Sequence, residues 1–528
     1  MGVPNNDEVA NLPYRQPVAA EHSVLHLLRA PWLIPLLALA IGARLYQLTA
    51  AAIWGDEGSS LLLAQFPLAG IWFHAAHDVH PPLYFMLLRA WIGLFGDSIE
   101  SIRMMSAVPG VIAVFLGTWL AHLIASRRAT MLTCLLLALL PTAVRYSQEI
   151  RMYSLMGVWL LGATLALVYW VRAPQRRRYL AIYALLMAAA FYTHYFSALC
   201  VLAHWAYLLV LRAPFAGAQR YIARRDWWLA NGAIVLLFLP WLPGLIDLVL
   251  HMDALEVGGD VGWEPAVTLR SMPSMLWQLM AQDDAEGMPL WLLLTLPGVL
   301  VAMMVYVVCT DRSCYRFATL VVLYSALPLL VLYGVSFVSP VFIERYLTAP
   351  ALGLAIILAL GIDSLARRFK VLALALLLAV LAVEGVGLKN NYTVDADDQF
   401  NDLVAYMNRH TQAGDQVVLG DMFWYLTWGY YDQSATAPRL YTPPTAAGVS
   451  TRPNSYGFGT LIDENAGVYL DHLQDLPQGN GRVWLVMSRE APDEFPSIPS
   501  GWRKIDQHAG GDTQAVLYEA CHVPCGTR

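Results

Sequence analysis

The chain has 528 residues, of which 58% are hydrophobic and only 14% charged, and its formal net charge is −6. Soluble globular domains carry about 25% charged residues, so this composition excludes an ordinary soluble protein and indicates a membrane protein. A mildly acidic chain without a basic surface also excludes nucleic acid as a partner, because binding to phosphate backbones requires clustered positive charge.

The first 31 residues are polar and include the acidic residues Asp7, Glu8 and Glu21. They lack the apolar stretch and small-residue cleavage site that define a secretory signal peptide. We therefore expect residues 1–31 to form a cytoplasmic tail.

Residues 32–388 have the composition of a membrane domain. A spanning helix needs about 20 apolar residues to cross a hydrocarbon core about 30 Å thick. The apolar segment 81–95 is only fifteen residues long and carries Arg89 in its middle, so we expect it to lie as a helix on the outer surface. The sequence predicts eleven spans, at 32–50, 104–125, 130–147, 152–171, 180–195, 196–212, 227–246, 289–309, 317–338, 346–363 and 371–388.

Charged residues in the loops predict the orientation of these spans. Arginines collect in the loop after every second span, beginning with Arg127 and Arg128, and such loops face the cytoplasm under the positive-inside rule. Nearly all loop carboxylates lie in the alternate loops. The outer loops 51–103 and 247–288, and everything after residue 388, are therefore expected on the opposite side.

Residues 389–528 have a mixed polar composition and are expected to form a small α/β domain outside the membrane. The sequence leaves open whether Cys521 and Cys525 form a disulfide, which an oxidising compartment would permit. The periodicity predicts a helix at 399–411 and strands at 416–420, 439–442, 482–488 and 515–518.

The first outer loop carries two polar motifs. Trp54-Gly55-Asp56-Glu57 follows the first span directly, and ionised carboxylates at a membrane surface are costly unless paired or functional. Neighbours on a helix point about 100° apart, so Asp56 and Glu57 cannot both address one atom. His80 precedes Pro81-Pro82, whose rigid backbone places the imidazole where it could bind a phosphate oxygen or a metal. Taken separately, each motif also fits a structural role, as an acidic helix start or a turn histidine.

Three further outer turns carry polar residues. Glu149 and Arg151 follow the third span, His194 ends the fifth, and Arg345 and Tyr346 follow the ninth. Each cluster alone also fits an interfacial aromatic belt with arginines that reach the headgroups. Their convergence on one surface indicates group transfer from a lipid-linked anionic donor, with a carboxylate accepting a proton and Arg or His neutralising a phosphate. A metal ion held by carboxylate oxygens is an alternative.

These motifs, in this order, resemble bacterial members of glycosyltransferase family 39. That group is similar to the protein O-mannosyltransferases and to the aminoarabinose transferases that modify lipid A. The resemblance covers about residues 32–365 and depends most on the Asp-Glu and His-Pro-Pro motifs together. The matching segments are Trp54–Glu57 with Ser60, His80–Tyr84, Arg103, Tyr146–Tyr153, Tyr192–Tyr195 and Arg345–Leu347.

The resemblance implies a polytopic α-helical membrane protein with the GT-C fold. About eleven transmembrane helices, interfacial helices in the first outer loop and a small C-terminal periplasmic α/β domain are expected. It also implies an inverting transfer from a polyprenyl-phosphate sugar donor to a lipid, glycan or protein acceptor. The reaction would take place at the periplasmic face of the bacterial inner membrane.

The resemblance also assigns roles to residues. Asp56 matches the catalytic aspartate, the expected general base, and Glu149 matches a second acidic position that assists the base or holds a metal. His80 stands where aminoarabinose transferases usually have a lysine near the donor phosphate, and Arg345 is expected to bind that phosphate. Substrate contacts are expected at Glu57, His80, Tyr84, Arg151, His194, Arg345 and Tyr346, and a divalent metal at Asp56, Glu149 and His80.

Two other functions fit parts of the sequence. A transporter or lipid flippase would place paired ionisable groups at mid-membrane, whereas the charged residues here collect at one surface. An inactive scaffold would use the C-terminal domain to recruit partners. The outer loop 247–288, with Trp263 and Trp277, either closes over the donor and excludes water or forms a static interfacial helix.

Overall fold

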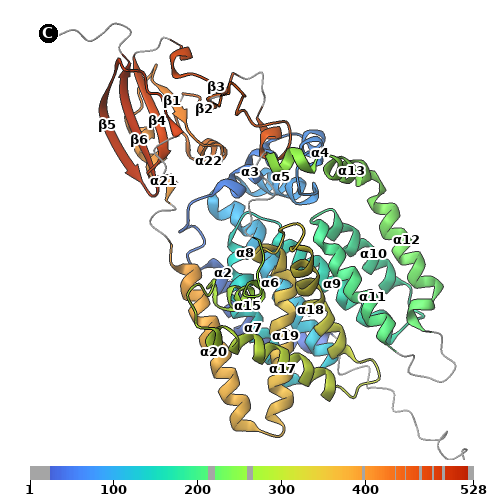
Figure 1. Cartoon of the computed structure of the whole chain (residues 1–528). Helices are drawn as coiled ribbons and strands as arrows, with labels where there is room; N and C mark the ends of the chain where they lie inside the picture. The colour runs from blue at the N-terminus through green and yellow to red at the C-terminus, as the bar shows by residue number, and fades with distance from the viewer. Residues whose placement is uncertain are drawn as a thin grey trace, which may run out of the picture.

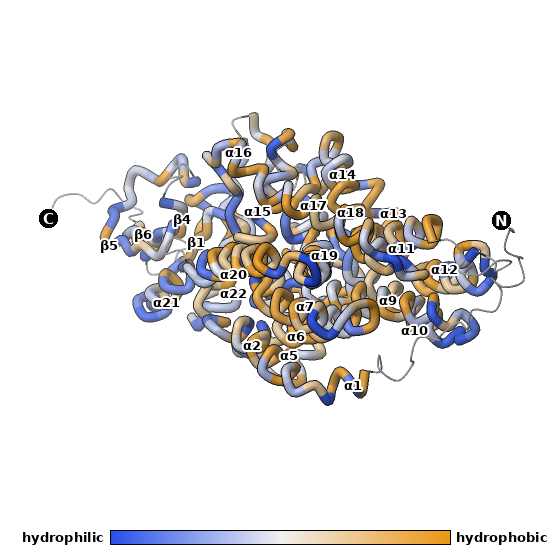
Figure 2. Tube along the Cα trace, turned by 90° about the horizontal axis from the view of Figure 1, so that it is seen from below, coloured by the Kyte–Doolittle hydropathy of each residue, from blue (hydrophilic) through white to orange (hydrophobic). Residues whose placement is uncertain are grey.

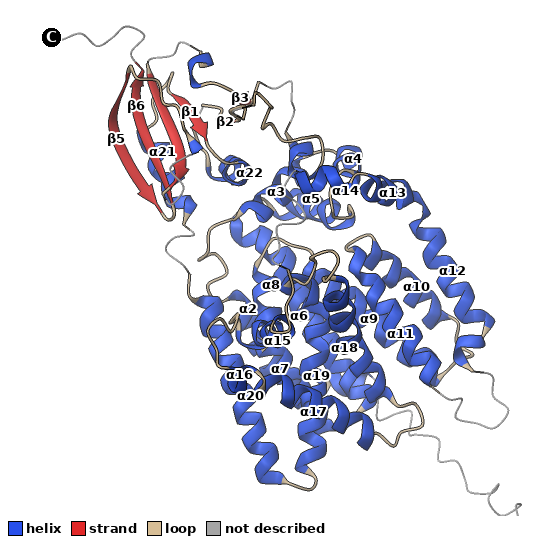
Figure 3. Cartoon of the chain, in the orientation of Figure 1, coloured by secondary structure: helices blue, strands red, loops and turns tan. Residues whose placement is uncertain are grey.

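The computed structural model has a helical bundle and a smaller domain that contains a β-sheet (Figure 1). It describes residues 24–520 except 212–219, 258–265, 395–398, 435, 446, 463–466, 478–480 and 490–493. The helical bundle ends with α20, Lys370–Tyr392, and the sheet domain follows it along the chain (Figure 3). Cys521 and Cys525, whose pairing the sequence leaves open, lie outside the described residues, as do Trp263 and most of the N-terminal tail.

The bundle confirms a multi-pass membrane protein. Within the described residues, seven helical segments are long and apolar enough to span a membrane, and a bent pair of helices adds an eighth. The remaining three predicted spans form shorter helices: α2, Leu33–Leu45; α10, Arg178–Phe191; and η2 with α11, Tyr195–Val210. The seven are α6, Ile99–Ile124; α9, Tyr153–Arg172; α12 to α13, Arg225–Leu250; α16 to α17, Leu290–Thr310; α18, Phe317–Val335; η5 with α19, Glu344–Ala366; and α20.

The bent pair is the predicted span 130–147, which the structure divides into α7, Arg127–Leu139, and α8, Pro141–Gln148, at an angle of 49°. Pro141 causes the break, since proline has no backbone N–H and disfavours a helical residue before it. Arg44 of α2 donates to the carbonyls of Leu137 and Ala138 at distances of 3.4 and 3.2 Å. A cation thus satisfies the free carbonyls at the end of α7.

Burial differs strongly between the helices. Nearly every residue of α19 is buried, whereas α12 and α20 expose rows of leucine and valine side chains. Hydrophobic residues dominate the helices, and hydrophilic residues concentrate in the loops and the sheet domain (Figure 2). The pattern is that of a bundle with an apolar outer surface that contacts lipid.

Three short helices of the first outer loop lie at the end of the bundle near the sheet domain (Figure 1). They are α3, Gly55–Gln65, α4, Leu68–Ala76, and α5, Leu83–Phe95. α5 has 13 residues, about 20 Å at about 1.5 Å each, so it is too short to span the membrane. Arg89 in the middle of α5 donates to the carbonyl oxygen of Gln65 at 2.9 Å, which explains how this cation is accommodated.

The C-terminal domain has one six-stranded sheet in the order β3-β2-β1-β4-β6-β5 within the described residues. The first four pair in parallel, and β6 is antiparallel to both β4 and β5. The helices α21, Phe400–His410, and α22, Met422–Tyr431, pack with the sheet. The strands are β1, Gln416–Leu419; β2, Arg439–Tyr441; β3, Tyr469–Leu470; β4, Arg482–Ser488; β5, Trp502–Gly510; and β6, Thr513–Ala520.

The predicted helix and four predicted strands of this domain are confirmed within a few residues, but β3, β5 and α22 were not predicted. β3 has only two residues, and β5 is a mostly exposed edge strand rich in charged and polar residues. Neither has the apolar alternation by which strands are found in a sequence. The remaining short helices are α1, Val24–Leu28; η3, Tyr221–Ala223; η4, Leu239–Trp241; α14, Met252–Val257; α15, Ser271–Ala281; η6, Gly457–Leu461; and η8, Leu473–Asp475.

Candidate active site

A cavity of about 630 Å³ lies where the outer turns of the bundle meet the C-terminal domain. We name it the catalytic pocket. Six of the residues predicted from sequence line it: Asp56, His80, Glu149, Arg151, Arg345 and Tyr346. Phe423 and Phe458 of the C-terminal domain complete its wall.

Asp56 lies in the first turn of α3, whose positive dipole end favours a carboxylate. Its Oδ2 is 2.6 Å from Nη1 of Arg345 and 3.6 Å from Nη2 of Arg151. Arg151 also donates from Nη1 to the Asp56 carbonyl oxygen at 3.0 Å and to Ser60 Oγ at 3.1 Å. The carboxylate is therefore fixed between two arginines that come from separate outer turns.

Glu57, the next residue, points to different partners, as the helical geometry predicts. Its side chain is fully buried, forms an ion pair with Arg103 at 3.1 Å, and accepts a hydrogen bond from the Ile150 amide at 2.8 Å. It also accepts one from the Trp54 amide at 3.4 Å, which caps α3. These contacts fasten the turn at Ile150 to the start of α3, so the geometry favours a positioning role over the predicted substrate contact.

His80 is held by the turn before α5. The Leu83 amide donates to the Tyr192 carbonyl at 3.0 Å, which anchors this turn to the end of α10. Arg151 Nη2 lies 3.3 Å from Nε2 of His80, and Asp78 Oδ1 lies 3.8 Å from Nδ1. Burial lowers the pKa of His80, with Arg151 acting in the same direction and Asp78 against it. A neutral imidazole that accepts from Arg151 at Nε2 is consistent with this environment.

Glu149 follows the last turn of α8 and forms an ion pair with Arg145 at 3.3 Å. Burial raises the pKa of Glu149 to about 7, and the nearby Glu57 adds to this, while Arg145 opposes it. Its Oε2 is buried and accepts no hydrogen bond from the part of the chain that the structure describes. The residue thus offers a carboxyl group that titrates close to neutral pH.

Two other predicted substrate residues lie behind the cavity wall. His194 packs its ring against His80 and Tyr346, with centroids 5.7 and 5.1 Å apart, and accepts at Nδ1 from the Phe196 amide. Tyr84 is fully buried and lines neither this cavity nor its neighbour. In this conformation both residues support the cavity wall, and their contact with substrate stays a prediction.

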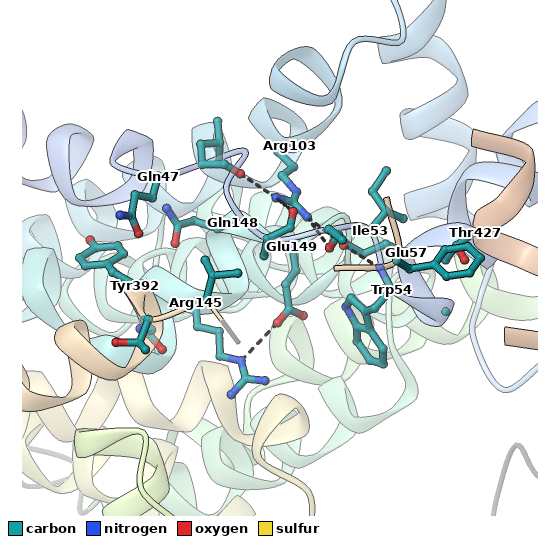
Figure 4. A pocket seen from close by; sticks show the side chains of 18 of the residues that line it. Gln47, Ile53, Trp54, Glu57, Arg103, Arg145, Gln148, Glu149, Tyr392 and Thr427 are labelled. Carbon is teal, nitrogen blue, oxygen red and sulfur yellow. Dashed lines mark hydrogen bonds and ion pairs between the residues drawn. The ribbon is translucent and has the colours of Figure 1, made fainter. Parts of the chain in front are cut away.

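A second cavity of about 540 Å³ adjoins the catalytic pocket. Gln47, Gln148 and Tyr392 gather at one side of it and Trp54 and Thr427 at the other, with Glu149 and Arg145 between (Figure 4). Four residues line both cavities: Trp54, Arg145, Glu149 and Phe423. The two cavities therefore border each other at these side chains.

Comparison with known proteins finds a family that is related in sequence and solved structures that have a similar fold. Residues 79–243 match the family described as dolichyl-phosphate-mannose-protein mannosyltransferase. No curated protein matches the sequence. The structure is similar to that of ArnT from Cupriavidus metallidurans in the apo state, with a TM-score of 0.61 and 14% identity over 94% of this chain and 98% of ArnT.

Two further solved structures are similar. ArnT bound to undecaprenyl phosphate has a TM-score of 0.60 at 14% identity, over 94% of this chain and 99% of that chain. The Archaeoglobus fulgidus oligosaccharyltransferase in complex with Zn and sulfate has a TM-score of 0.51 at 13% identity, over 87% of this chain and 68% of that one. This chain shares its fold with both proteins, and the family match relates its residues 79–243 to the protein mannosyltransferases. The chain therefore has the fold of ArnT and of the archaeal oligosaccharyltransferase.

The metal site predicted from the sequence does not assemble from the expected ligands. Among the residues described, no three His, Cys, Asp or Glu side chains are placed to hold one metal ion. Asp56 instead faces Arg151 and Arg345, and Glu149 faces Arg145. The mechanism proposed below therefore uses side chains alone.

The structure also brings to the cavity residues that were not predicted as part of the site. Arg145 precedes Glu149 by one helical turn, a spacing that could have suggested the pair. Glu344 accepts hydrogen bonds from the Tyr146 hydroxyl at 3.3 Å and from Gln278 at 3.1 Å, and so joins η5 to α8 and α15. Phe423 has no local signal, because its approach depends on how the C-terminal domain docks.

The described part of the loop 247–288 forms helices that pack against the bundle. In α15, Leu276, Leu279 and Met280 are buried, and Thr142 donates to the Leu279 carbonyl at 2.7 Å. Trp277 Nε1 donates to the Leu293 carbonyl at 3.0 Å. Of the two expectations for this loop, these contacts favour a static helix over a mobile cover.

Proposed function

We propose that this glycosyltransferase moves one sugar from a polyprenyl-phosphate donor to a hydroxyl group of a lipid, glycan or protein acceptor. The observation that carries the proposal is the Asp56 carboxylate held between Arg151 and Arg345, in a cavity at one end of the spanning helices. The relation to mannosyltransferases named for a dolichyl-phosphate donor, and the fold shared with ArnT bound to undecaprenyl phosphate, support it.

The arginines give this arrangement a way to couple donor binding to activation of the base. The donor phosphate is an anion and competes with Asp56 for Arg345 and Arg151, because guanidinium groups bind phosphate as well as carboxylate. Transfer of these contacts to the phosphate releases the Asp56 carboxylate. The base then becomes available only when the donor is in place.

The reaction proposed is a single displacement. The acceptor oxygen bonds to the anomeric carbon while the bond from that carbon to the phosphate oxygen breaks, and polyprenyl phosphate leaves. The acceptor proton passes to Asp56, and the arginines stabilise the negative charge on the leaving phosphate. Attack on the face opposite the leaving group inverts the configuration at the anomeric carbon.

We place this site at the periplasmic surface of the bacterial inner membrane. The positive-inside rule assigns the arginine-rich loops to the cytoplasm, and the site lies at the other ends of the same helices. Glu149 lies at the boundary between the two cavities and, as a carboxylate, would accept a hydrogen bond from the incoming hydroxyl. Its role is therefore to orient the acceptor for the Asp56 base.

The test replaces the base by its neutral isostere. The purified Asp56→Asn protein should lose at least about 100-fold in transfer rate, the scale on which a positioned base acts. Transfer is measured with radiolabelled polyprenyl-phosphate sugars and membrane extracts as acceptor. Asp97→Asn, at an exposed carboxylate of the same outer loop, is the matched control and should retain the wild-type rate. A wild-type rate in Asp56→Asn would remove the central claim, and a retained ability to flip the donor lipid across vesicles without transfer would favour a transporter.

A further inference from the structure

Amide side chains line the second cavity, and the proposed function assigns them no role. Gln148, Asn390 and Asn391 line it and each fixes its amide group by donating to backbone carbonyls. We name this cavity the amide pocket. The inference below concerns what the amide pocket binds, and it rests on the proposed function.

The orientation of these amides follows from their partners. Gln148 Nε2 donates to the carbonyls of Arg44 and Tyr46 at 3.0 and 2.8 Å, and Asn391 Nδ2 donates to that of Pro141 at 2.8 Å. Asn390 Nδ2 donates to the carbonyls of Ala281 and Gln282 at 3.0 and 3.2 Å. A carbonyl oxygen can only accept, so each amide must direct its nitrogen there and keep its own oxygen for another donor.

These oxygens have no donor within the part of the chain that the structure describes. The Asn391 Oδ1 atom is buried without a hydrogen-bond partner among the described residues. A buried polar atom left unpaired costs free energy, so such an atom beside a cavity points to a ligand that donates hydrogen bonds. Hydroxyl groups are donors of this kind, whereas phosphate and carboxylate oxygens only accept.

Four of the five charged side chains that line the amide pocket form ion pairs with one another, and the fifth, Asp512, is acidic; this argues against an anionic ligand. Arg103 forms its ion pair with Glu57 at 3.1 Å, and Arg145 forms its ion pair with Glu149 at 3.3 Å. The aromatic side chains of Trp54 and Trp424 also line the cavity and provide flat apolar surfaces. Neutral acceptors beside aromatic faces suit a sugar ring, which carries hydroxyl groups at its edge and C–H groups on its faces.

The position of the amide pocket connects it to the reaction. Trp54, Arg145, Glu149 and Phe423 border both cavities, so a hydroxyl group that extends from the amide pocket passes Glu149 before it reaches Asp56. Its volume of about 540 Å³ lies within the range of about 300–1,000 Å³ usual for small-molecule sites. We propose that the amide pocket binds the acceptor and that the acceptor is an uncharged saccharide, either free or as the headgroup of a glycolipid.

The experiment uses the full chain in lipid nanodiscs and a defined set of probes. These are neutral oligosaccharides of two to four hexoses, the same oligosaccharides as alkyl glycosides, and a serine- and threonine-containing peptide. Binding is followed by tryptophan fluorescence and native mass spectrometry. Binding of the alkyl glycosides alone would identify the source as a glycolipid, and equal binding of both forms would identify a glycan.

Two variants remove the amide groups with little change in side-chain volume. In Gln148→Met and Asn390→Leu, saccharide affinity should fall at least about fivefold each, as expected for the loss of a hydrogen bond. Gln474→Met, at an exposed amide on the C-terminal domain, is the matched control and should bind as the wild type does. Absence of saccharide binding, equal binding by these variants, or binding of the peptide alone would overturn the inference.

A second experiment distinguishes a failure of this inference from a failure of the proposed function. Release of sugar from a polyprenyl-phosphate donor is measured in the wild type and in Asp56→Asn, without any acceptor. Release that depends on Asp56, combined with no saccharide binding, would leave the function standing and reject the amide pocket. Saccharide binding that depends on Gln148, combined with no release or transfer from any donor, would reject the function and keep the pocket.

Discussion

At Glu149 two opposing effects act on one carboxyl group. Burial disfavours its charged form and raises the pKa, while the Arg145 guanidinium at 3.3 Å favours that form and lowers it. Burial prevails, and the pKa of Glu149 is raised to about 7. The carboxyl is therefore mostly protonated at pH 6 and mostly ionised at pH 8, so its state changes within the physiological range.

This titration predicts a pH dependence of transfer. In the proposed mechanism the ionised Glu149 carboxylate accepts a hydrogen bond from the hydroxyl group of the acceptor substrate. We therefore expect kcat/KM to rise with pH through about 7. In Glu149→Gln the rise should disappear, with a rate about tenfold below the wild type at pH 8 and close to it at pH 6. Initial rates are measured between pH 5.5 and 9. Glu256→Gln, at an exposed carboxylate of α14, should keep the wild-type profile. A rise that persists in Glu149→Gln would assign the titration to another group.

Between elements, the C-terminal domain docks on α3, the helix that carries Asp56. Gly55 and Gly58 lie one turn apart on α3, and α22 approaches their face closely. A Cβ atom at Gly58 would lie 2.7 Å from the Leu426 carbonyl oxygen, which is nearer than any side chain tolerates. The Tyr431 hydroxyl accepts from the Ile53 amide at 2.8 Å beside this contact. The domain thus fixes the start of α3 and, through it, the position of Asp56.

The glycine contact gives a prediction for α3. Gly58→Ala should force α22 away, lower the thermal unfolding temperature and reduce kcat about tenfold, since small displacements of catalytic groups are costly. Gly93→Ala is the matched control, because a Cβ there meets no atom within 4 Å in α5. That change should raise stability by about 0.5–1 kcal/mol through better helix propensity and leave kcat unchanged. Thermal unfolding and turnover are measured on both, and wild-type turnover in Gly58→Ala would show that the docking is dispensable.

At the scale of the whole molecule, the two ends of the bundle differ. The site residues come from turns at one end, where the C-terminal domain also lies. The other end carries Asp363 in ion pairs with Arg128 and Arg367 at 2.6 and 2.8 Å. Two thiols are exposed at that end, Cys309 in the last turn of α17 and Cys314 in the connection between α17 and α18. They provide natural probes of orientation.

The proposed orientation predicts from which side of the membrane a reagent can label these thiols. With Cys521 and Cys525 changed to serine, a membrane-impermeant maleimide should label Cys309 and Cys314 in inside-out vesicles and leave them unlabelled in intact spheroplasts. A Glu100→Cys variant that also lacks Cys309 and Cys314 should show the reverse pattern, since this exposed position begins α6 near the site. Mass spectrometry of the labelled protein reads the result. Labelling of Cys314 from the outside would invert the topology and place the site in the cytoplasm.

Local sequence determined much about this protein, because its main signals act over short distances. Hydropathy reveals each apolar helix, arginine position predicts orientation, and Asp56 is marked by the motif around it. Periodicity also located α21 and most strands of the C-terminal domain. Span length was less accurate, since a single proline, Pro141, divides one apolar run into two helices and tertiary contacts decide the angle.

The pairing of the polar residues depends on contacts between distant parts of the chain. Arg345 and Asp56 are 289 residues apart in sequence, and the Ile150 amide reaches Glu57 across 93. Such contacts depend on the packing of distant helices, about which spacing along the chain carries no information. The amide pocket is the clearest case, since the membrane helices and the C-terminal domain each supply part of its wall. Its chemistry exists only after both parts have folded and docked.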